Sequence, residues 1–261
     1  MAELQGSIAV VTGASSGLGR RFAVDLAGAG AVVIGLARRE DLLGALAGEM
    51  RRTSPRSATV VCDVSDPDHF VAVLTQIERE HGRIDVLINN AGIGEQAADE
   101  RRPLAPYRTV METNFFAAVA GSLAVFPGMG ERRRGVIVNV SSDTGRAPGP
   151  GEVAYGASKA ALSAFSEGLS YEAERVGVHV HVLYPGWVAT AMGSALIEAG
   201  QPMPPRIVRR TEAQVSRLLL ARMGGRRVDI DAAPVARMAP VARALAPSLY
   251  RKGVRKAVGE G

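Results

Sequence analysis

Short apolar runs alternate with amphipathic stretches along the first 190 residues of the chain. The runs are rich in Val and Ile, which is typical of strands that are buried on both faces of a sheet. The stretches between them carry apolar residues at helical spacing. This alternation predicts an α/β fold, a Rossmann-like doubly wound parallel sheet of about seven strands with helices on both faces. The expected strands are residues 8–11, 31–34, 58–61, 86–88, 136–140 and 178–183, with 227–230 as the seventh.

Helices are expected between these strands and after the last of them. The first five predicted helices span residues 18–29, 41–52, 70–80, 113–129 and 153–175. Thr211-Glu-Ala-Gln214 resembles a capping box, which predicts that a further helix starts there and runs to about Met223. Apolar residues at helical spacing predict a last helix over 236–250, and the tail from 251 onward is expected to fray.

Two uncharged runs, 113–130 and 176–197, are long enough to be considered as membrane spans. The first contains Asn114, several glycines and Pro127, and the second contains two histidines and a Pro-Gly break. Part of the second run also alternates like a strand. We therefore expect neither run to cross a membrane.

The length of 261 residues suits a single α/β domain, and 47% apolar with 22% charged residues is typical of a folded globular protein. We divide the domain into a core over 1–190, a covering loop, helix and last strand over 191–231, and a basic helical extension over 232–261. The single cysteine, Cys62, cannot form an internal disulfide, and the first residues lack a signal-peptide pattern. We therefore expect a cytoplasmic protein. No His or Cys spacing suggests a metal site.

The positive charge is concentrated near the C-terminus. Residues 201–261 hold 13 Lys and Arg against 4 Asp and Glu, whereas the rest of the chain holds 18 against 22. The extension at 232–261 could dock on its own subunit, on a partner subunit or on an anionic membrane surface, and we favour docking on protein. No nucleic-acid partner is expected, because the arginines are not interleaved with aromatic residues and no helix-turn-helix pattern is evident.

A glycine-rich turn follows the first predicted strand and opens the first predicted helix. Its sequence is Thr12-Gly13-Ala14-Ser15-Ser16-Gly17-Leu18-Gly19. Glycines let a backbone approach a pyrophosphate closely, and the amides at a helix N-terminus meet the charge of that group. A tight strand–helix turn without a ligand is the structural alternative. The position after the first strand favours a dinucleotide site.

Further motifs follow in order along the chain. Asn89-Asn90-Ala91-Gly92 follows the fourth predicted strand, Ser142 follows the fifth, and Tyr155-Gly-Ala-Ser-Lys159 supplies a Y-x-x-x-K pair. Pro185-Gly-Trp-Val-Ala-Thr190 follows the sixth strand. With the T-G-x-x-x-G-x-G turn, the chain over residues 5–192 resembles the classical branch of the short-chain dehydrogenase/reductase family. The resemblance implies hydride transfer between a nicotinamide cofactor and a carbonyl or secondary alcohol.

The resemblance implies that Asn114, Ser142, Tyr155 and Lys159 are the catalytic residues. Tyr155 and Lys159 are four residues apart, so they share one face of a helix. A nearby ammonium, together with the positive ring of the oxidised cofactor, stabilises phenolate, so we expect a lowered pKa for Tyr155. The matching serine of the family binds the substrate oxygen, for which Ser142 is preferred over Ser141. The matching asparagine of the family holds a water that joins Lys159 to a proton relay.

The same resemblance implies a cofactor site that is spread over the core. Asp63 would meet the adenine amino group, Asn90 would lie beside the adenosine ribose, and Thr190 would lie near the nicotinamide carboxamide. The full set of expected cofactor residues is Thr12, Gly13, Ser15, Ser16, Gly17, Leu18, Gly19, Arg38, Arg39, Asp63, Val64, Asn90, Ala91, Gly92, Tyr155, Lys159, Pro185, Gly186, Val188 and Thr190.

The end of the second predicted strand bears on the choice between NAD(H) and NADP(H). NAD enzymes place a carboxylate there for the ribose 2′-hydroxyl, but this chain has Ala37 followed by Arg38 and Arg39. A guanidinium binds phosphate well, so we expect NADP(H) with Arg38 as the phosphate contact. Two surface arginines paired with Glu40 and Asp41 are the alternative. Ser16 replaces a basic residue often found in NADP-preferring relatives, which leaves NAD(H) as the second choice of cofactor.

The substrate side is less informative. Residues 191–207 are expected to form a loop over the nicotinamide, and its apolar residues suit either an apolar pocket or helix packing; they are Met192, Ala195, Leu196, Ile197 and Met203. Glu152 and Trp187 are expected at its border. We expect a small-molecule substrate, an apolar carbonyl compound, and the resemblance implies a broad choice among oxoacyl thioesters, steroids, polyketide intermediates and simple carbonyls. The alternatives are an NADP(H)-binding regulator without turnover and an epimerase or dehydratase, which the short length disfavours. The resemblance also implies a homodimer or homotetramer, formed through the helices that carry Asn114 and Tyr155.

Overall fold

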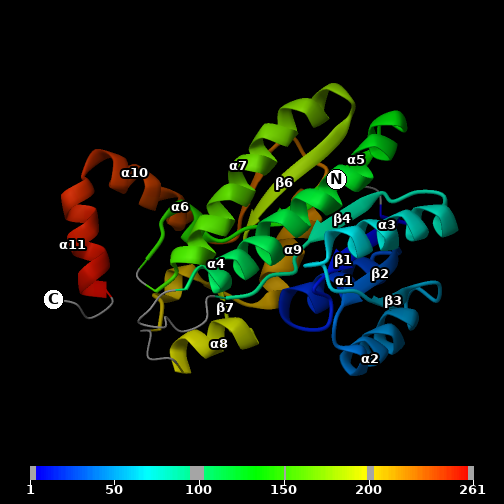
Figure 1. Ribbon diagram of the computed structural model, residues 1–261, viewed down its shortest axis with the longest axis horizontal. Coiled ribbons are helices and arrows are strands. Elements are labelled where there is room, and N and C mark those ends of the chain that lie inside the picture. Colours follow the sequence, from blue (N-terminus) through cyan, green and yellow to red (C-terminus); the bar gives the residue numbers. More distant parts are fainter. Residues whose placement is uncertain (1–3, 95–102, 150, 199–202, 258–261) are drawn as a thin grey trace.

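The computed structural model describes residues 4–94, 103–149, 151–198 and 203–257. Within them, seven parallel strands form one sheet in the order β3-β2-β1-β4-β5-β6-β9 (Figure 1). The strands are β1 (Ile8–Thr12), β2 (Val32–Ala37), β3 (Ala58–Val61), β4 (Val86–Asn89), β5 (Gly135–Val140), β6 (Val178–Tyr184) and β9 (Asp229–Asp231). The order reverses direction between β1 and β4, as it does in a doubly wound sheet. The predicted fold class is therefore confirmed.

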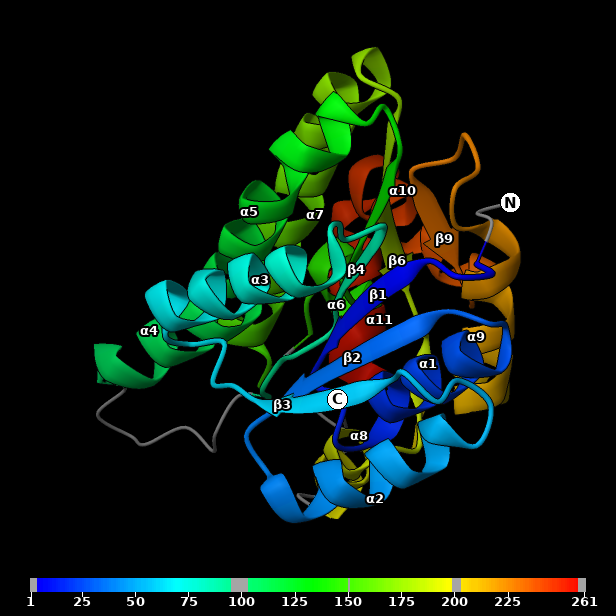
Figure 2. The ribbon, with the colours of Figure 1, turned by 90° about the vertical axis from the view of Figure 1, so that its right-hand side faces the viewer.

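Helices cover both faces of this sheet. One face is covered by α1 (Gly17–Gly28), α2 (Glu40–Arg51) and α9 (Glu212–Arg222), and the other by α3 (Pro67–His81), α5 (Ala117–Glu131) and α7 (Val153–Arg175). Figure 2 shows the two helical layers on either side of the strands. The remaining helical segments are α4 (Leu104–Met111), η1 (Glu112–Phe116), α6 (Asp143–Arg146), α8 (Ala191–Glu198), η2 (Arg206–Val208), η3 (Pro234–Arg237), α10 (Met238–Leu245) and α11 (Pro247–Ala257).

The central strands are buried because helices lie on both sides of them. Every residue of β1, β2, β4 and β5 is buried. Successive side chains point to opposite faces, so Val11 joins the core beneath α1 and α2, while Val10 joins the core beneath α3 and α5. The edge strand β3 is only partly buried. This burial accounts for the continuous Val and Ile runs in the sequence.

The helix expected over 113–129 is part of a longer helical stretch, Leu104–Glu131, which widens into a π-helical turn at η1. By length and composition, this stretch is the one candidate membrane span among the described residues. It lies along the sheet between α3 and α7 and contributes Ala117, Val125 and Met129 to the core. That packing accounts for part of its apolar character, because 39% of its most apolar window is buried.

The C-terminal part departs from the expected boundaries. The seventh strand is present, but it covers Asp229–Asp231 rather than 227–230. The capping box is confirmed, because the Thr211 hydroxyl accepts the Gln214 N–H at 3.2 Å and the Gln214 side chain accepts the Thr211 N–H at 2.9 Å. The single helix over 236–250 is wrong.

Two helices with a break between them replace that single helix. Ala246 leaves the helical region, with φ −140° and ψ 63°, because the ring of Pro247 disfavours helical backbone in the residue before it. Helix α11 then continues to Ala257, so fraying from 251 is also wrong over these residues. The expected loop over 191–207 is partly ordered too, because it contains α8 and η2 and borders a short ladder of β7 (Trp187–Val188) and β8 (Arg209–Arg210).

Candidate active site

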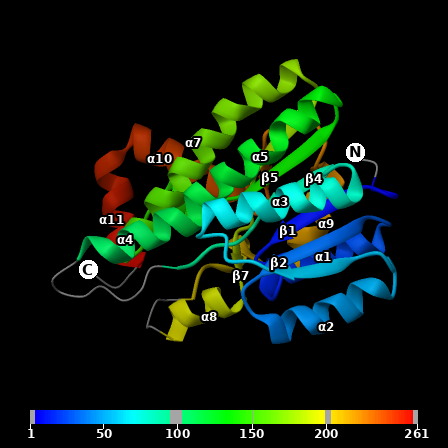
Figure 3. The ribbon, with the colours of Figure 1, turned by 45° about the vertical axis from the view of Figure 1, so that its right-hand side comes forward.

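A cavity of about 660 Å³ lies at the carboxyl ends of the strands, where ligands bind in open α/β sheets. It is lined by the glycine-rich turn, the ends of β2, β4 and β5, the start of α7, and α8. Figure 3 shows α8 at the lower edge of the molecule and α10 and α11 at its left end. Among the described residues, nearly all of the predicted site residues border this one cavity.

Thr12 joins the first and fourth strands at the rim of the cavity. Its hydroxyl accepts the N–H groups of Asn90 and Ala91, each at 3.0 Å. The side-chain amide of Asn90 donates back to the Thr12 carbonyl at 3.0 Å. These bonds hold the segment after β4 against the glycine-rich turn. Thr12 therefore acts through Asn90 and Ala91, which line the cavity.

The glycines of the turn are required by its geometry. Gly13 and Gly17 have φ values of 66° and 56°, which side chains rarely adopt. A Cβ at Gly19 would lie 2.3 Å from the Gly13 carbonyl oxygen. Ser16 is the N-cap of α1 but makes no side-chain cap hydrogen bond. The first amides of α1 therefore lack a hydroxyl cap and lie beside the cavity, which fits a pyrophosphate.

The two arginines after β2 are held differently. The Arg39 guanidinium donates to the hydroxyls of Ser15 at 2.9 Å and Ser16 at 2.7 Å. Arg38 lies 3.6 Å from the Asp63 carboxylate. Within the described residues, neither arginine forms the alternative ion pair with Glu40 or Asp41. Sequence reasoning named Arg38 as the phosphate contact, but the structure places Arg39 on the glycine-rich turn.

Asp63 lines the cavity beside the buried residues Cys62 and Val64. Burial opposes ionisation of its carboxyl, but hydrogen bonds from Ser65 and the charge of Arg38 lower its pKa overall. One carboxylate oxygen accepts the Ser65 N–H at 3.0 Å and the Ser65 hydroxyl at 2.8 Å. The carboxylate therefore stays ionised and can accept a hydrogen bond from an amino group.

Asn114 lies in the π-helical turn η1 and is buried. Its side-chain amide bonds both the N–H of Ile93, at 2.8 Å, and the carbonyl of Ile93, at 3.0 Å. It also donates to the Ser158 hydroxyl at 3.1 Å. A Cβ at Gly92 would lie 3.2 Å from the Asn114 amide oxygen and 3.5 Å from the Lys159 ammonium. Asn114 thus fixes the wall of the cavity next to Lys159; its water-holding role stays a prediction.

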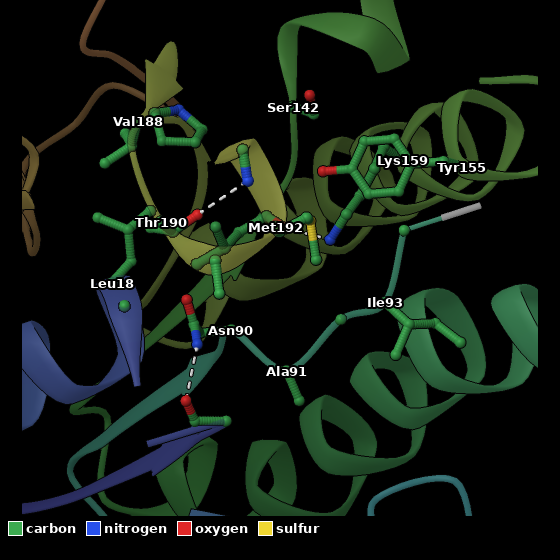
Figure 4. Close-up of a pocket in the computed structure, with 18 of the residues that line it drawn as sticks. Leu18, Asn90, Ala91, Ile93, Ser142, Tyr155, Lys159, Val188, Thr190 and Met192 are labelled. Atoms are coloured by element: carbon green, nitrogen blue, oxygen red, sulfur yellow. Dashed lines mark hydrogen bonds between the residues drawn. The ribbon is translucent and has the colours of Figure 1, made fainter. Parts of the chain in front are cut away.

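The two serines after β5 have different partners. The Ser141 hydroxyl bonds the Lys159 carbonyl at 3.0 Å and the Ser163 hydroxyl at 2.8 Å. The Ser142 hydroxyl caps α6, where it accepts the Thr144 N–H at 3.2 Å, and it hydrogen-bonds the Tyr155 side chain. Ser142 is therefore the serine that shares a site with the phenol (Figure 4), which agrees with its preference over Ser141.

Tyr155 is a neutral phenol over the whole physiological pH range. Burial raises its pKa to about 12, against the lowering effect of the Ser142 hydrogen bond, and the negative charges of Glu152 and Asp143 raise it as well. The expected lowering of the pKa is therefore not met in this chain by itself. Burial is the main reason, and the Lys159 ammonium does not offset it: it lies 5.8 Å from the ring centroid and donates to the Val140 carbonyl at 2.8 Å.

Lys159 is buried at the base of the cavity (Figure 4). Burial lowers its pKa to about 8, because the ammonium loses its hydration. Its position one turn after Tyr155 on α7 agrees with the predicted shared face. A cation here attracts hydroxyl groups and negative charge that enter the cavity.

The Pro-Gly motif after β6 forms one wall of the cavity. Gly186 has φ 72°, and a Cβ there would lie 2.7 Å from the Val208 carbonyl oxygen. The methyl group of Thr190 would lie 3.1 Å from a Cβ at Gly17, which brings this motif against the glycine-rich turn. Pro185, Gly186, Val188 and Thr190 all line the cavity, as do the predicted residues Val64 and Leu18.

The substrate side of the cavity is mainly apolar. Its lining residues include Ile93, Trp187, Met192, Ile197, Pro204 and Val208. Ala195 and Met203 are exposed and do not line the cavity, and the side chain of Leu196 lies outside the described part of the structure. Glu152 borders the site as predicted and accepts a hydrogen bond from the Thr144 hydroxyl at 3.3 Å.

Asp143 is the site residue that sequence reasoning missed. It directly follows Ser142 and lines the cavity, and burial raises its pKa to about 6. The sequence did contain a signal for it: an acidic residue immediately after the predicted serine must lie near the reacting groups, so Asp143 could have been predicted as a site residue. Arg146 holds the segment that carries it, through ion pairs with Asp229 and Asp231 and a guanidinium stacked 3.2 Å from the Tyr184 ring centroid.

Comparison with known proteins gives consistent matches. The family model described as short chain dehydrogenase matches residues 7–200. The chain is 39% identical to a short chain dehydrogenase of Pseudocercospora fijiensis over 74% of this chain, and it spans 63% of that protein's length. It is 33% identical to the dehydrogenase/reductase SDR family member 7B of Bos taurus, over 95% of this chain and 80% of that one.

Two further matches concern reductases by their names. The chain is 36% identical to the 3-oxoacyl-(acyl-carrier-protein) reductase FabG of Escherichia coli, over 74% of this chain and 78% of that one. Among solved structures, an actinorhodin polyketide ketoreductase with NADPH has a TM-score of 0.79 and 28% identity, covering 88% of this chain and 97% of that one.

Proposed function

Because the chain belongs to the short-chain dehydrogenase family and is an oxidoreductase of that family, we propose that it transfers hydride from NADPH to the carbonyl carbon of an apolar substrate. One observation carries the proposal. The Tyr155 phenol, hydrogen-bonded to Ser142 and backed by Lys159, faces a cavity whose other half is the glycine-rich turn. The proton donor and the turn that would bind the dinucleotide therefore line the same cavity.

The residues present fit a nicotinamide dinucleotide. The amides at the start of α1 would hold the pyrophosphate, Asp63 would accept from the adenine amino group, and Lys159 would hold the nicotinamide ribose. When bound, the cofactor supplies the hydride. Asn90 and Ala91 would border the adenosine ribose, because Thr12 fixes them against the turn.

Two observations support NADPH over NADH. β2 ends at Ala37, so no carboxylate stands there to repel a 2′-phosphate. The Arg39 guanidinium donates to the hydroxyls of Ser15 and Ser16. The guanidinium and the two hydroxyls are hydrogen-bond donors for a phosphate, at the place where the adenosine ribose would reach the turn. Arg38 borders the same part of the cavity but is engaged by Asp63.

The chain's own residues account for the proton side of the reaction. A carbonyl oxygen between Ser142 and Tyr155 would accept hydrogen bonds from both hydroxyls. The Tyr155 pKa of about 12 keeps the phenol protonated, so it can deliver its proton to the oxygen as negative charge develops there. To stabilise the phenolate that remains, the Lys159 ammonium would turn from the Val140 carbonyl toward the phenol once cofactor and substrate are bound.

The apolar lining of the cavity supports an apolar substrate. The carbonyl would lie at Ser142, with the rest of the molecule against Trp187, Met192 and Val208. The names of two matched proteins, a 3-oxoacyl reductase and a polyketide ketoreductase, support a keto group on a longer carbon chain as the first substrate class to try. Both substrate classes combine a polar carbonyl with an apolar body, as this cavity requires.

We further propose a homodimer or homotetramer in the cytoplasm. Large apolar or aromatic side chains are exposed on the layer formed by η1, α5 and α7, namely Phe116, Leu123, Val153 and Tyr171. A second copy of the same layer would cover them. Cys62 is buried, and burial raises the pKa of its thiol to about 11, so the thiol stays protonated and takes no part in the chemistry.

The test is consumption of NADPH and of NADH over a panel of 3-oxoacyl thioesters, cyclic ketones, quinones and small aldehydes. Tyr155→Phe is expected to lose about 10²–10⁴-fold in rate, because it removes the proton donor. Tyr171→Phe is the matched control, because Tyr171 is exposed on the same helix. Tight NADPH binding without turnover on any panel member would instead favour an NADP(H)-binding regulator.

A further inference from the structure

The last two helices stand off the body of the protein. Figure 1 shows α10 and α11 at one end of the molecule, away from the sheet. No residue in 238–255 is buried. These two helices therefore bury none of these residues on their own subunit, and their surface remains open to a partner subunit or a membrane.

Apolar side chains on these helices are exposed to an unusual degree. Met238, Val241 and Leu245 follow one another at spacings of three and four residues, so they share one face of α10. Leu245 is 82% exposed and Leu249 at the start of α11 is 71% exposed. A soluble helix normally buries such a face.

The charges on the same segment all have one sign. Arg243, Arg251, Lys252 and Arg255 are exposed, and the sequence has no acidic residue between Asp231 and Glu260. In α11, Arg251 and Arg255 are four residues apart and share a face that points away from Leu249. Exposed leucines flanked by basic residues only are typical of helices that lie in a membrane interface.

The exposed apolar surface continues to the mouth of the cavity. Ala236, in η3 just before α10, lines the cavity, and so does Val208 at the end of η2. η2 contacts η3, and their exposed side chains Ile207 and Val235 extend the apolar surface between the cavity and α10. A partner that covers this surface would therefore also meet the entrance of the site.

We propose that α10 and α11 bind the surface of a bilayer that contains anionic lipid. The apolar side chains of Met238, Val241, Leu245 and Leu249 enter the boundary of the acyl chains, and the basic side chains meet the lipid phosphates. A second copy of the same helices is a poorer partner, because a two-fold axis would bring like charges together. Nucleic acid is poorer too, because it leaves the leucines uncovered.

The first experiment is co-sedimentation of the full chain with vesicles of phosphatidylcholine, alone or mixed with phosphatidylglycerol, at low and high salt. Binding is expected only with the mixed vesicles and is expected to weaken as salt screens the charges. The triple variant Arg251→Gln, Lys252→Gln, Arg255→Gln should weaken the partition coefficient about fivefold per residue, roughly 100-fold in all. The control triple Arg52→Gln, Arg56→Gln, Arg175→Gln removes the same charge from exposed positions on other elements and should bind as the parent does.

A second variant tests the apolar half of the proposal. Leu245→Ser with Leu249→Ser should abolish sedimentation while leaving NADPH binding unchanged, because both side chains are exposed and lie outside the cavity. The assay needs no turnover, so its outcome is separate from that of the proposed activity. Binding to phosphatidylcholine alone, insensitivity to the α11 triple variant, or a dimer that this double variant dissociates without any vesicle binding would overturn the proposal.

Discussion

Asp143 offers the sharpest test of the electrostatics of the site. It is the first residue of α6, and its buried Oδ1 has no hydrogen-bond partner among the described residues. Burial raises the pKa of its carboxyl to about 6, although Arg146 and Arg210 oppose that effect. Asp143→Asn keeps the size of the side chain and removes the charge, so it isolates the cost of the ionised form.

The size of the effect follows from the two pKa values of the carboxyl. A carboxyl with a pKa of about 6 in the folded state and 3.8 in the unfolded state costs about 3 kcal/mol of stability once it is ionised. The cost is absent below pH 3.8, grows as the pH rises, and is complete above about pH 6. The buried amide of Asn forfeits about 1–2 kcal/mol for unmet hydrogen bonds. The net gain expected for Asp143→Asn is therefore about 1–2 kcal/mol near pH 8.

Urea unfolding of the parent and the variant across the range from pH 4 to pH 8 measures this difference. The variant should be no more stable than the parent at the acid end, gain stability through the middle of the range, and then stay level. The gain corresponds to roughly 3–6 °C in Tm near pH 8. Exposed Asp41→Asn is the control and should show no such gain. A difference in stability that does not change with pH would refute the argument that the buried charge is costly.

Three further predictions concern cofactor choice, catalysis and packing. Arg39→Gln should weaken NADPH binding about 10–100-fold in a fluorescence titration and leave NADH binding unchanged, whereas Arg38→Gln should have the smaller effect; equal losses for both coenzymes would contradict this. The rate of reduction should fall as the pH rises through about 8, because Lys159 loses its charge there while Tyr155 keeps its proton; initial rates that stay level to pH 10 would speak against it. Arg146→Ala should lower the free energy of unfolding by about 2–3 kcal/mol, because it leaves buried Asp231 with only the longer ion pair to Arg237. A loss below about 0.5 kcal/mol in urea unfolding would show that the ion pairs of Arg146 do not contribute to folding stability.

The sheet and the glycine-rich turn could be predicted because few alternatives fit their residues. A run such as Ile8–Val11 has no polar face, so it suits only a strand that is covered on both sides. Gly13, Gly17 and Gly19 stand where side chains would collide or adopt a rare φ, so their spacing reports a backbone shape directly. Local constraints of this kind can be seen in a single sequence.

Other features depend on choices that the sequence leaves open. Arg39 rather than Arg38 reaches Ser15 and Ser16. Which of two neighbouring arginines makes this contact depends on their side-chain rotamers, and the sequence pattern does not specify rotamers. The pKa of Tyr155 rises because of burial and the orientation of Lys159, both of which require coordinates. The break before Pro247 was different: the proline was a readable signal that the helical spacing of the neighbouring residues concealed.

The two halves of the site are built in different ways, and this explains why the chemistry can be inferred further than the substrate. Tyr155 and Lys159 lie on α7, and the end of β5 holds Lys159 in place: its ammonium donates to the Val140 carbonyl, and its carbonyl accepts from the Ser141 hydroxyl. A substitution there disturbs the sheet as well as the reaction, so the residues that do chemistry are tied to those that fold. The substrate half is formed by α8, η2 and η3, whose side chains are largely exposed and make few bonds to the core. Their apolar character fits a ligand, a neighbouring subunit or a lipid surface equally well, so only binding measurements on this face can define what enters the cavity.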